Sequence, residues 1–193
     1  LRALSKYQSS FKWYGFVRFE KEFLDPRFCR NLKDSGCEML KLGLESGDQN
    51  VLDNMNKGTE LSMVSATLKN LNRAGILTFV YLLFGTGFED EKAAYRTLDF
   101  IEEHKSYIDY LNLAVFNLPK FSEDALDLET REFYHGDLSL YLNFIHPSGW
   151  ERRKVKKFLD KTFKKRVLSH STIKRNPFLF SSNHAMFFKK DPS

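Results

Sequence analysis

Short apolar runs alternate with helix-forming stretches from Trp13 to Asn117, and this alternation limits the folds that the chain can adopt. Strands and helices that alternate at this spacing predict right-handed βαβ units and a parallel sheet. We therefore expect an α/β fold with four parallel βα units. The strands are expected over Trp13 to Phe19, Met39 to Leu44, Ile76 to Phe84 and Leu111 to Leu118, with Pro119 ending the last one.

The expected helices carry recognisable end signals. Asp25 precedes Pro26, a pair typical of an N-cap followed by the first helical residue, and Gly36 closes this helix. We expect Thr59 to cap a longer helix that ends at Gly75. The other helices are expected as a short turn from about Asp48, stopped at Asn56-Lys57-Gly58, and as a helix from about Asp90 to His104.

The pattern changes near residue 120, so we expect residues 1–119 and 120–193 to form two different parts. The second part starts with a polar, acidic segment from Phe121 to Asp137. An alternating run from Leu138 to Phe144 then predicts an extra strand. The end, from Asn176 to Ser193, mixes phenylalanines with turn formers and gives no assignment.

The positive charge is concentrated in an amphipathic helix predicted from Trp150 to Val167. The whole chain has a formal net charge of +5, yet residues 151–175 hold eleven Lys or Arg and only two acids. The favoured interpretation is a solvated face on a capping helix, and the alternative is a surface for RNA phosphates or an acidic partner. Nucleic acid is therefore not the expected partner. The stripe that would face the core is Val155, Phe158, Leu159 and Phe163.

Two cysteines occur, Cys29 and Cys37, and their spacing matches no common metal or redox motif. We expect buried free thiols, no disulfide and a cytoplasmic location. The histidines show no ligand spacing, so no metal site is expected. No apolar run approaches the roughly eighteen residues of a membrane span, so no membrane partner is expected. The start at Leu1, without Met or a signal sequence, suggests a piece of a longer protein.

Polar residues and glycines gather where the expected strands end. Sites form at the carboxyl ends of parallel strands, because those ends meet at one edge of the sheet. Arg18 could bind a carboxylate through two hydrogen bonds, and Glu45 could accept hydrogen bonds from an ammonium or from ribose hydroxyls. Gly85 and Gly87 could let a flat heterocycle come close to the backbone. Alternatively the glycines only make turns, and Arg18 pairs with Glu20 at the surface. The candidate ligand-binding residues are Arg18, Glu20, Glu45, Ser46, Gly85, Gly87, Glu89 and Asn117.

Several short motifs follow one another between Tyr14 and Pro119. They are Arg18-x-Glu20, Gly36-Cys37, Leu42-Gly43-Leu44-Glu45-Ser46-Gly47, Val51-Leu52, Met55, Lys57-Gly58, Ala74-Gly75-Ile76 and Gly85-Thr86-Gly87-Phe88-Glu89. In this order they closely resemble a segment of the radical S-adenosylmethionine superfamily. The resemblance is greatest to the branch that often carries an upstream cobalamin-binding domain. The last motif departs from the family's usual Gly-x-Pro-Gly-Glu, because Phe88 adds bulk.

The resemblance implies a partial (β/α) barrel of six units, of which this chain would supply the last four. In the family, a Cys-x3-Cys-x2-Cys loop holds a [4Fe–4S] cluster that binds S-adenosylmethionine and cleaves it reductively to a 5′-deoxyadenosyl radical. The resemblance places the Glu45-Ser46 loop near the ribose and methionine part of that cofactor, and the Gly85 loop near its adenine. Cys29 and Cys37 cannot replace three closely spaced thiolates, so the cluster ligands are expected before Leu1.

The implied parent protein is an iron–sulfur enzyme, Fe–S oxidoreductase-like, with S-adenosylmethionine, a [4Fe–4S] cluster and, as a further candidate, cobalamin. This chain would contribute walls for the cofactor and for a small-molecule substrate, and would be inactive alone. Its expected partner is the N-terminal remainder of the same protein. The open edge of its sheet predicts either a homodimer or an edge covered by the C-terminal extension. Two alternatives are an RNA-modifying enzyme that binds tRNA through the basic helix, and a non-catalytic interaction module.

Overall fold

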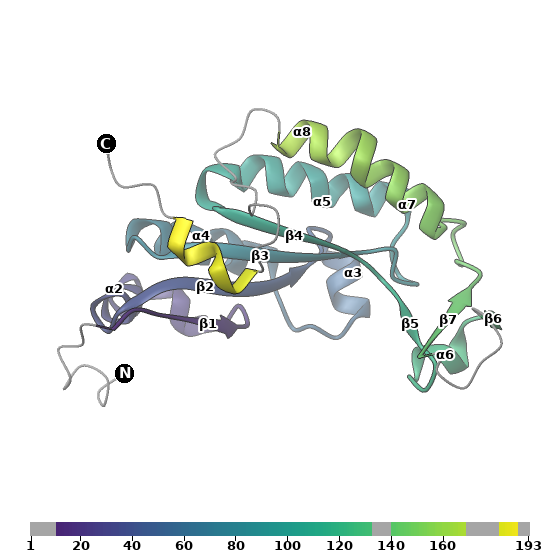
Figure 1. Cartoon of the computed structure of the whole chain (residues 1–193), viewed down its shortest axis with the longest axis horizontal. Coiled ribbons are helices and arrows are strands. Elements are labelled where there is room, and N and C mark those ends of the chain that lie inside the picture. Colours follow the sequence, from purple (N-terminus) through teal and green to yellow (C-terminus); the bar gives the residue numbers. More distant parts are fainter. Residues whose placement is uncertain (1–10, 133–139, 169–181, 189–193) are drawn as a thin grey trace.

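A four-stranded parallel sheet forms the centre of the molecule, with the strand order β1-β2-β3-β4 (Figure 1). The computed structural model describes residues 11–132, 140–168 and 182–188. Strands that are consecutive in the chain are neighbours in the sheet, as the predicted βα units require. The α/β class with this parallel sheet is therefore confirmed. The strands are β1 (Trp13–Val17), β2 (Cys37–Glu45), β3 (Leu77–Phe84) and β4 (Tyr110–Val115).

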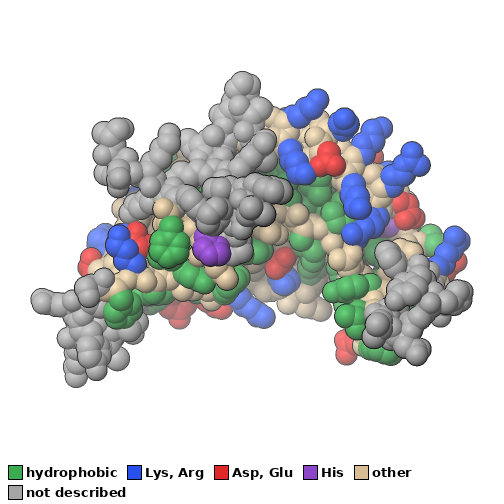
Figure 2. All heavy atoms as spheres, in the orientation of Figure 1, with side chains coloured by type: hydrophobic (Ala, Val, Ile, Leu, Met, Phe, Trp, Pro, Cys, Tyr) green, Lys and Arg blue, Asp and Glu red, His purple; other side chains and the backbone are tan. Residues whose placement is uncertain are grey.

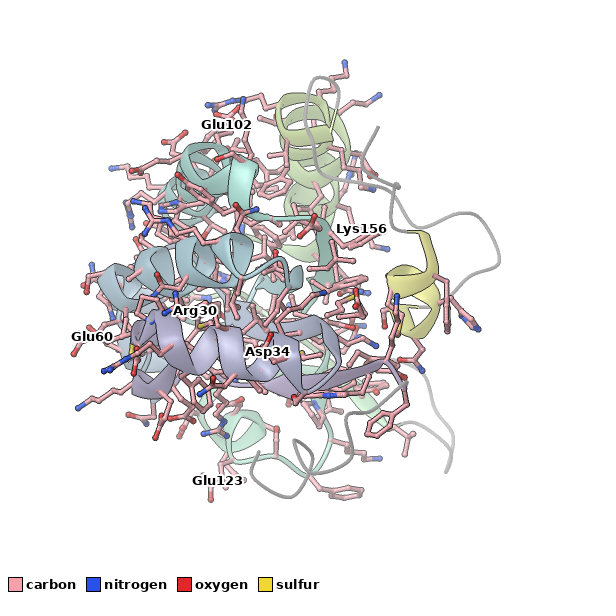
Figure 3. The ribbon with its side chains drawn as sticks, turned by 90° about the vertical axis from the view of Figure 1, so that its left-hand side faces the viewer. Arg30, Asp34, Glu60, Glu102, Glu123 and Lys156 are labelled. Carbon is pink, nitrogen blue, oxygen red and sulfur yellow. The ribbon has the colours of Figure 1, made fainter. Side chains whose placement is uncertain are left out.

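Helices cover one face of this sheet (Figure 1 and Figure 3). Their apolar side chains form the main core with alternate strand residues such as Leu42 of β2 and Val80 of β3. Because successive strand residues point to opposite faces, Lys41 and Phe79 lie on the other side, which is called the open face below. The helices are α2 (Pro26–Asp34), α3 (Gln49–Asn54), α4 (Leu61–Arg73) and α5 (Glu91–His104), with 3-10 turns η1 (Lys21–Leu24) and η2 (Lys105–Tyr107).

The end signals in the sequence account for most helix boundaries. The Asp25 carboxylate accepts the N–H of Arg27 at 2.9 Å and so caps α2, as predicted. Asp48 and Asp90 cap α3 and α5 in the same manner. Gly36 follows α2 and has a φ of 94°. This positive φ is the left-handed conformation in which glycine commonly ends a helix.

The predicted cap of α4 is wrong. Glu60, not Thr59, is the residue before the helix, and its side chain makes no capping bond. Gln49 supplies the acceptor instead, because its Oε1 accepts the N–H of Leu61 at 3.0 Å. A side chain from the preceding helix therefore takes the place of the capping residue. The sequence next to α4 contains no signal for this long-range contact.

The fourth strand is shorter than the sequence predicts. β4 ends at Val115, and Phe116 makes one further bond from its N–H to the carbonyl of Phe84, at 2.8 Å. β5 (Leu118–Pro119) belongs to a second, antiparallel sheet with the order β5-β7-β6. Pro119 is accommodated there because β5 is an edge strand, where a missing N–H costs little. The sheet is completed by β6 (Thr130–Glu132) and β7 (Tyr141–Phe144), with α6 (Asp124–Asp127) beside it.

The predicted basic helix is present, with a π-helical turn in its middle. It consists of α7 (Arg152–Phe158), η3 (Leu159–Phe163) and α8 (Lys164–Leu168). All four residues of the predicted apolar stripe are buried in the main core. The lysines and arginines lie outward and form the basic surface in the upper part of Figure 2.

The C-terminal segment η4 (Ser182–Phe188) lies across the open face, on the side of the sheet away from α2 and α4 (Figure 3). Ala185 and Met186 pack against Met39 and Phe79 in a second, smaller core. This segment covers a face and not the edge of β1. Within the described ranges no strand pairs with the outer edge of β1, and the homodimer stays a prediction. None of the described helices has the length and apolar character needed to cross a membrane.

Candidate functional site

Two of the predicted ligand-binding residues, Arg18 and Glu45, line one pocket on the open face. The pocket has a volume of about 380 Å³ and lies between β1, β2 and β3. It is called the open-face pocket below. Its lining residues are Phe16, Val17, Arg18, Lys41, Gly43, Glu45 and Tyr81. Adjacent parallel strands thus bring together a guanidinium and a carboxylate that lie far apart in the sequence.

Glu45 has an unusual backbone conformation. Its φ is 67°, a region that costs strain for any residue with a Cβ. The pairing of β2 with β3 shifts register between Gly43 and Glu45. The Glu45 side chain lies close over Gly43, where an added Cβ would be 3.0 Å from its Oε1. Lys57 Nζ is 3.4 Å from the same oxygen. Gly43 therefore leaves the space in which this carboxylate sits at the pocket wall.

Lys41 is a lining residue that the sequence analysis missed. It is only 1% exposed, although it carries an ammonium group. Its Nζ donates to Asn183 Oδ1 at 2.5 Å and to Ser182 Oγ at 3.3 Å, both in η4. It also lies 4.4 and 4.6 Å from the ring centroids of Tyr14 and Phe16. Burial lowers the pKa of Lys41. The available signal was a lysine inside the otherwise apolar run from Met39 to Leu44.

Ser46 follows Glu45 but is tied to α5. Its hydroxyl is fully buried, lies 3.1 Å from Thr97 Oγ1 and accepts the N–H of Asp48 at 3.1 Å. Thr97 Oγ1 also accepts the N–H of Gly47 at 2.9 Å. These bonds hold the end of β2 against α5. They give Ser46 a structural role, and its contact with a ligand stays a prediction.

The Gly85 to Glu89 loop closes around a buried carboxylate. Glu89 is 1% exposed, and its Oε2 accepts the N–H of Gly85 at 2.5 Å and the indole N–H of Trp150 at 3.0 Å. Burial raises the pKa of Glu89 to about 7, and these two bonds act in the opposite direction. Among the described residues, Glu89 Oε1 and Thr86 Oγ1 have no hydrogen-bond partner. Glu89 therefore anchors the loop to the segment before α7.

The remaining candidates lie in other places. Gly85 and Asn117 line a pocket of about 450 Å³ beside the second sheet, where Arg152 Nη1 donates to Asn117 Oδ1 at 2.7 Å. Gly87 lines another pocket of about 450 Å³, together with Phe88. Glu20 is exposed just before η1. Of the candidate residues, only Arg18 and Glu45 share the open-face pocket.

Both cysteines are buried free thiols, as predicted. Burial raises the pKa of Cys37 to about 12, so the side chain stays a neutral thiol. Iron–sulfur clusters are held by thiolates. In the part of the chain that the structure describes, no group of three His, Cys, Asp or Glu side chains could hold a metal ion. The residues present here do not fit a [4Fe–4S] cluster.

The sequence is similar to part of a curated methyltransferase. Over 72 residues it is 36% identical to bacteriochlorophyllide d C-12(1)-methyltransferase from Chlorobaculum tepidum. The matched segment covers 37% of this chain and 16% of that protein. This chain therefore spans less than a fifth of the length of its relative. No protein-family profile matches the chain.

The fold is similar to that of a solved radical S-adenosylmethionine methyltransferase, TsrM from Kitasatospora setae. Its structure with cobalamin and a [4Fe–4S] cluster matches with a TM-score of 0.56 and 15% identity, over 66% of this chain and 24% of that one. Its structure with tryptophan substrate and the S-adenosylmethionine analogue aza-SAM matches with a TM-score of 0.52 and 16% identity, over 61% and 24%. At these identities the likeness shows a shared α/β fold.

Proposed function

We propose that this chain forms one wall of the cofactor and substrate site of a radical S-adenosylmethionine methyltransferase. The sequence likeness to one methyltransferase and the fold shared with another support this proposal. Both relatives are methyltransferases, so methyl transfer fits better than the oxidoreductase activity expected from the sequence. In the whole protein, the four parallel strands would belong to a larger (β/α) barrel with their open face turned inward.

The meeting of Arg18 and Glu45 in the open-face pocket carries the proposal. Arg18 is exposed and could bind the carboxylate of S-adenosylmethionine through its planar guanidinium. Glu45 could accept from the ammonium or from the ribose hydroxyls, with Lys57 holding its carboxylate in place. The bound cofactor would supply the methyl group.

The cluster would have to be held elsewhere in the protein, because neither cysteine of this chain is available as a thiolate. We place a cobalamin site in the remainder of the protein as well. The chain alone would therefore be inactive, and its partner would be the remainder of the same protein. The presence of two free thiols agrees with a reducing, cytoplasmic environment.

Binding of radiolabelled S-adenosylmethionine tests the proposal, measured by equilibrium dialysis on the full-length protein after anaerobic iron–sulfur reconstitution. Arg18→Gln and Glu45→Gln should each weaken binding roughly tenfold or more, since a charged hydrogen bond contributes about 1.5–3 kcal/mol. Glu22→Gln is the control, because Glu22 is exposed in η1 and lies outside the pocket. Absence of binding by the unmodified protein would favour a non-catalytic interaction module. Unchanged binding by both pocket variants would refute the site.

The basic surface of α7 to α8 supports a second candidate function, in which the enzyme modifies RNA (Figure 2). Arg152 donates hydrogen bonds to Phe116 O and Asn117 Oδ1. Its replacement would disturb these bonds, so it is left out of the test of RNA binding. Replacement of Arg153, Lys156, Lys157 and Lys161 by Gln should abolish salt-sensitive tRNA binding if this candidate is correct. Equal tRNA binding before and after the replacement would exclude it.

A further inference from the structure

Lys41 is a buried cation, and the contacts of its Nζ with the described residues are with neutral groups. It is 1% exposed in the middle of β2, and its Nζ donates to two uncharged oxygens, those of Ser182 and Asn183. No ion pair to Lys41 occurs among residues 11–132, 140–168 and 182–188. A buried charge without a counter-charge is costly, so proteins rarely keep one without a use for it.

The environment of Lys41 is that of an incomplete anion site. The aromatic rings of Tyr14 and Phe16 stabilise the ammonium through their π faces. The neutral oxygens of η4 occupy two of its three N–H donors. Neither kind of neighbour neutralises the charge. The described contacts thus leave the ammonium without an anion.

A ligand of Lys41 would lie in the open-face pocket, which this residue helps to line. Lys41 and Arg18 both line it, while Phe16 and Tyr81 supply aromatic wall. The pocket's one carboxylate, that of Glu45, is already paired with Lys57. The two cations of the pocket therefore outnumber its available anions.

The C-terminal segment η4 is bonded to residues on the open face of the sheet. Tyr81 OH donates to Ser182 Oγ at 2.9 Å, and Tyr110 OH donates to the carbonyl of Ala185 at 3.0 Å. η4 is thus attached to β3 and β4 as well as to Lys41. Two of the residues that η4 contacts, Lys41 and Tyr81, also line the pocket.

We infer that the open-face pocket binds the carboxylate of a small organic acid, with Lys41 and Arg18 as the anion-binding side chains. The inference rests on the proposed function, since it names the class of molecule that the same pocket takes. Phe16 and Tyr81 favour a flat or aromatic body next to the carboxylate. The carboxylate is either that of the substrate or that of S-adenosylmethionine itself, and the experiment separates the two.

Benzoate is the probe, and benzamide is its uncharged counterpart. Ligand-observed NMR titration of the 193-residue chain should show benzoate binding at least tenfold tighter than benzamide. Lys41→Met and Arg18→Gln should each remove most of this preference. Lys69→Met is the control, because Lys69 also lies over an aromatic ring, that of Tyr107, but outside the pocket.

Thermal melting separates a binding role of Lys41 from a structural one. If Lys41 serves to bind an anion, Lys41→Met should melt at the same temperature as the unmodified chain or higher, because a buried charge is replaced by an apolar chain of similar length. A lower melting temperature with unchanged benzoate affinity would overturn the inference, since Lys41 would then only hold η4. Equal affinity for benzoate and benzamide would overturn it as well. Arg18→Gln, an exposed change, keeps the test informative if Lys41→Met does not fold.

Competition identifies the source of the carboxylate. If S-adenosylmethionine displaces benzoate and its decarboxylated form does not, the anion site belongs to the cofactor. If S-adenosylmethionine and its decarboxylated form each bind at the same time as benzoate, the anion site belongs to the substrate. Either result supports the inference. Benzoate binding does not need the cluster, so it can succeed even where the full-length protein fails to bind S-adenosylmethionine and the proposed function is refuted.

Discussion

The indole N–H of Trp150 donates a 3.0 Å hydrogen bond to the Glu89 carboxylate, across 61 positions of the chain. The same oxygen accepts the N–H of Gly85, so one buried acid joins the loop after β3 to the segment that leads into α7. This contact explains why the C-terminal part packs on the helical side of the sheet in a defined position.

Glu89 should make the stability of the fold depend on pH. Burial raises its pKa from the ordinary 4.5 to about 7, so the folded chain holds this proton over a range in which the unfolded chain releases it. The stabilisation is complete below pH 4.5 and is lost as the pH rises through 7. Glu89→Gln should reduce this loss, which is about 3 kcal/mol at most. Urea unfolding at pH 4.5 and 7.5 measures it, with Glu91→Gln as the exposed control; equal pH profiles for the unmodified chain and Glu89→Gln would contradict it.

Gly85→Ala should destabilise the chain by about 2–3 kcal/mol. Gly85 has a φ of 79°, which costs a residue with a Cβ roughly 1–2 kcal/mol, and the new Cβ would lie 3.1 Å from Val155 Cγ2 in the core. Gly58→Ala is the matched control, with a φ of 62° and no atom within 4 Å of the new Cβ. Thermal unfolding of both variants isolates the contact with Val155. Equal losses would show that backbone strain alone matters.

Thr97→Val should cost about 1–3 kcal/mol, because it leaves the buried N–H of Gly47 and the hydroxyl of Ser46 without Thr97 Oγ1. Thr67→Val provides the contrast. Its hydroxyl is equally buried but has no partner among the described residues, so its removal should be neutral or slightly stabilising. Chemical unfolding of the two variants tests the difference. A loss in Thr67→Val as large as in Thr97→Val would mean that packing, and not hydrogen bonding, dominates at both positions.

Gly43→Ala should impair ligand binding more than stability. The added Cβ would lie 3.0 Å from Glu45 Oε1, and the carboxylate can yield because it is the end of a flexible side chain. We expect S-adenosylmethionine binding by the full-length protein to weaken several-fold, with a loss of stability of about 1 kcal/mol or less. Gly15→Ala in β1 is the control, since its nearest side-chain contact would be an ordinary 3.6 Å. Equal binding by both variants would show that the position of Glu45 does not matter.

The parallel sheet and the helix ends could be predicted because their signals are local. The capping residue Asp25 lies next to the helix that it starts, and the apolar face of α5 repeats along one stretch of sequence. Two of the boundary differences, at the start of α4 and at the end of β4, have distant causes. Gln49 reaches Leu61 from the preceding helix, and Leu118 leaves the parallel sheet because β7 pairs with it.

The site could be predicted only in part. The rule that parallel strands end at one edge selected Arg18 and Glu45, which line a common pocket, and their contact with a ligand stays a prediction. The rule selects positions by sequence and not by side-chain direction, so it also included Ser46 and Glu89. Both side chains are buried and make hydrogen bonds within the fold. It omitted Lys41, which lies inside a strand and not after one.

The sequence by itself determined the order of strands and helices, the apolar stripe of the basic helix and the family resemblance, because each depends on residues that are close in the chain. Only the tertiary structure decided which polar groups face a pocket. Ser182 and Asn183 lie more than 140 positions after Lys41, and folding alone brings them to its ammonium. The burial of Lys41 and of Glu89 is a property of packing between distant segments, and packing sets the energy of a buried charge.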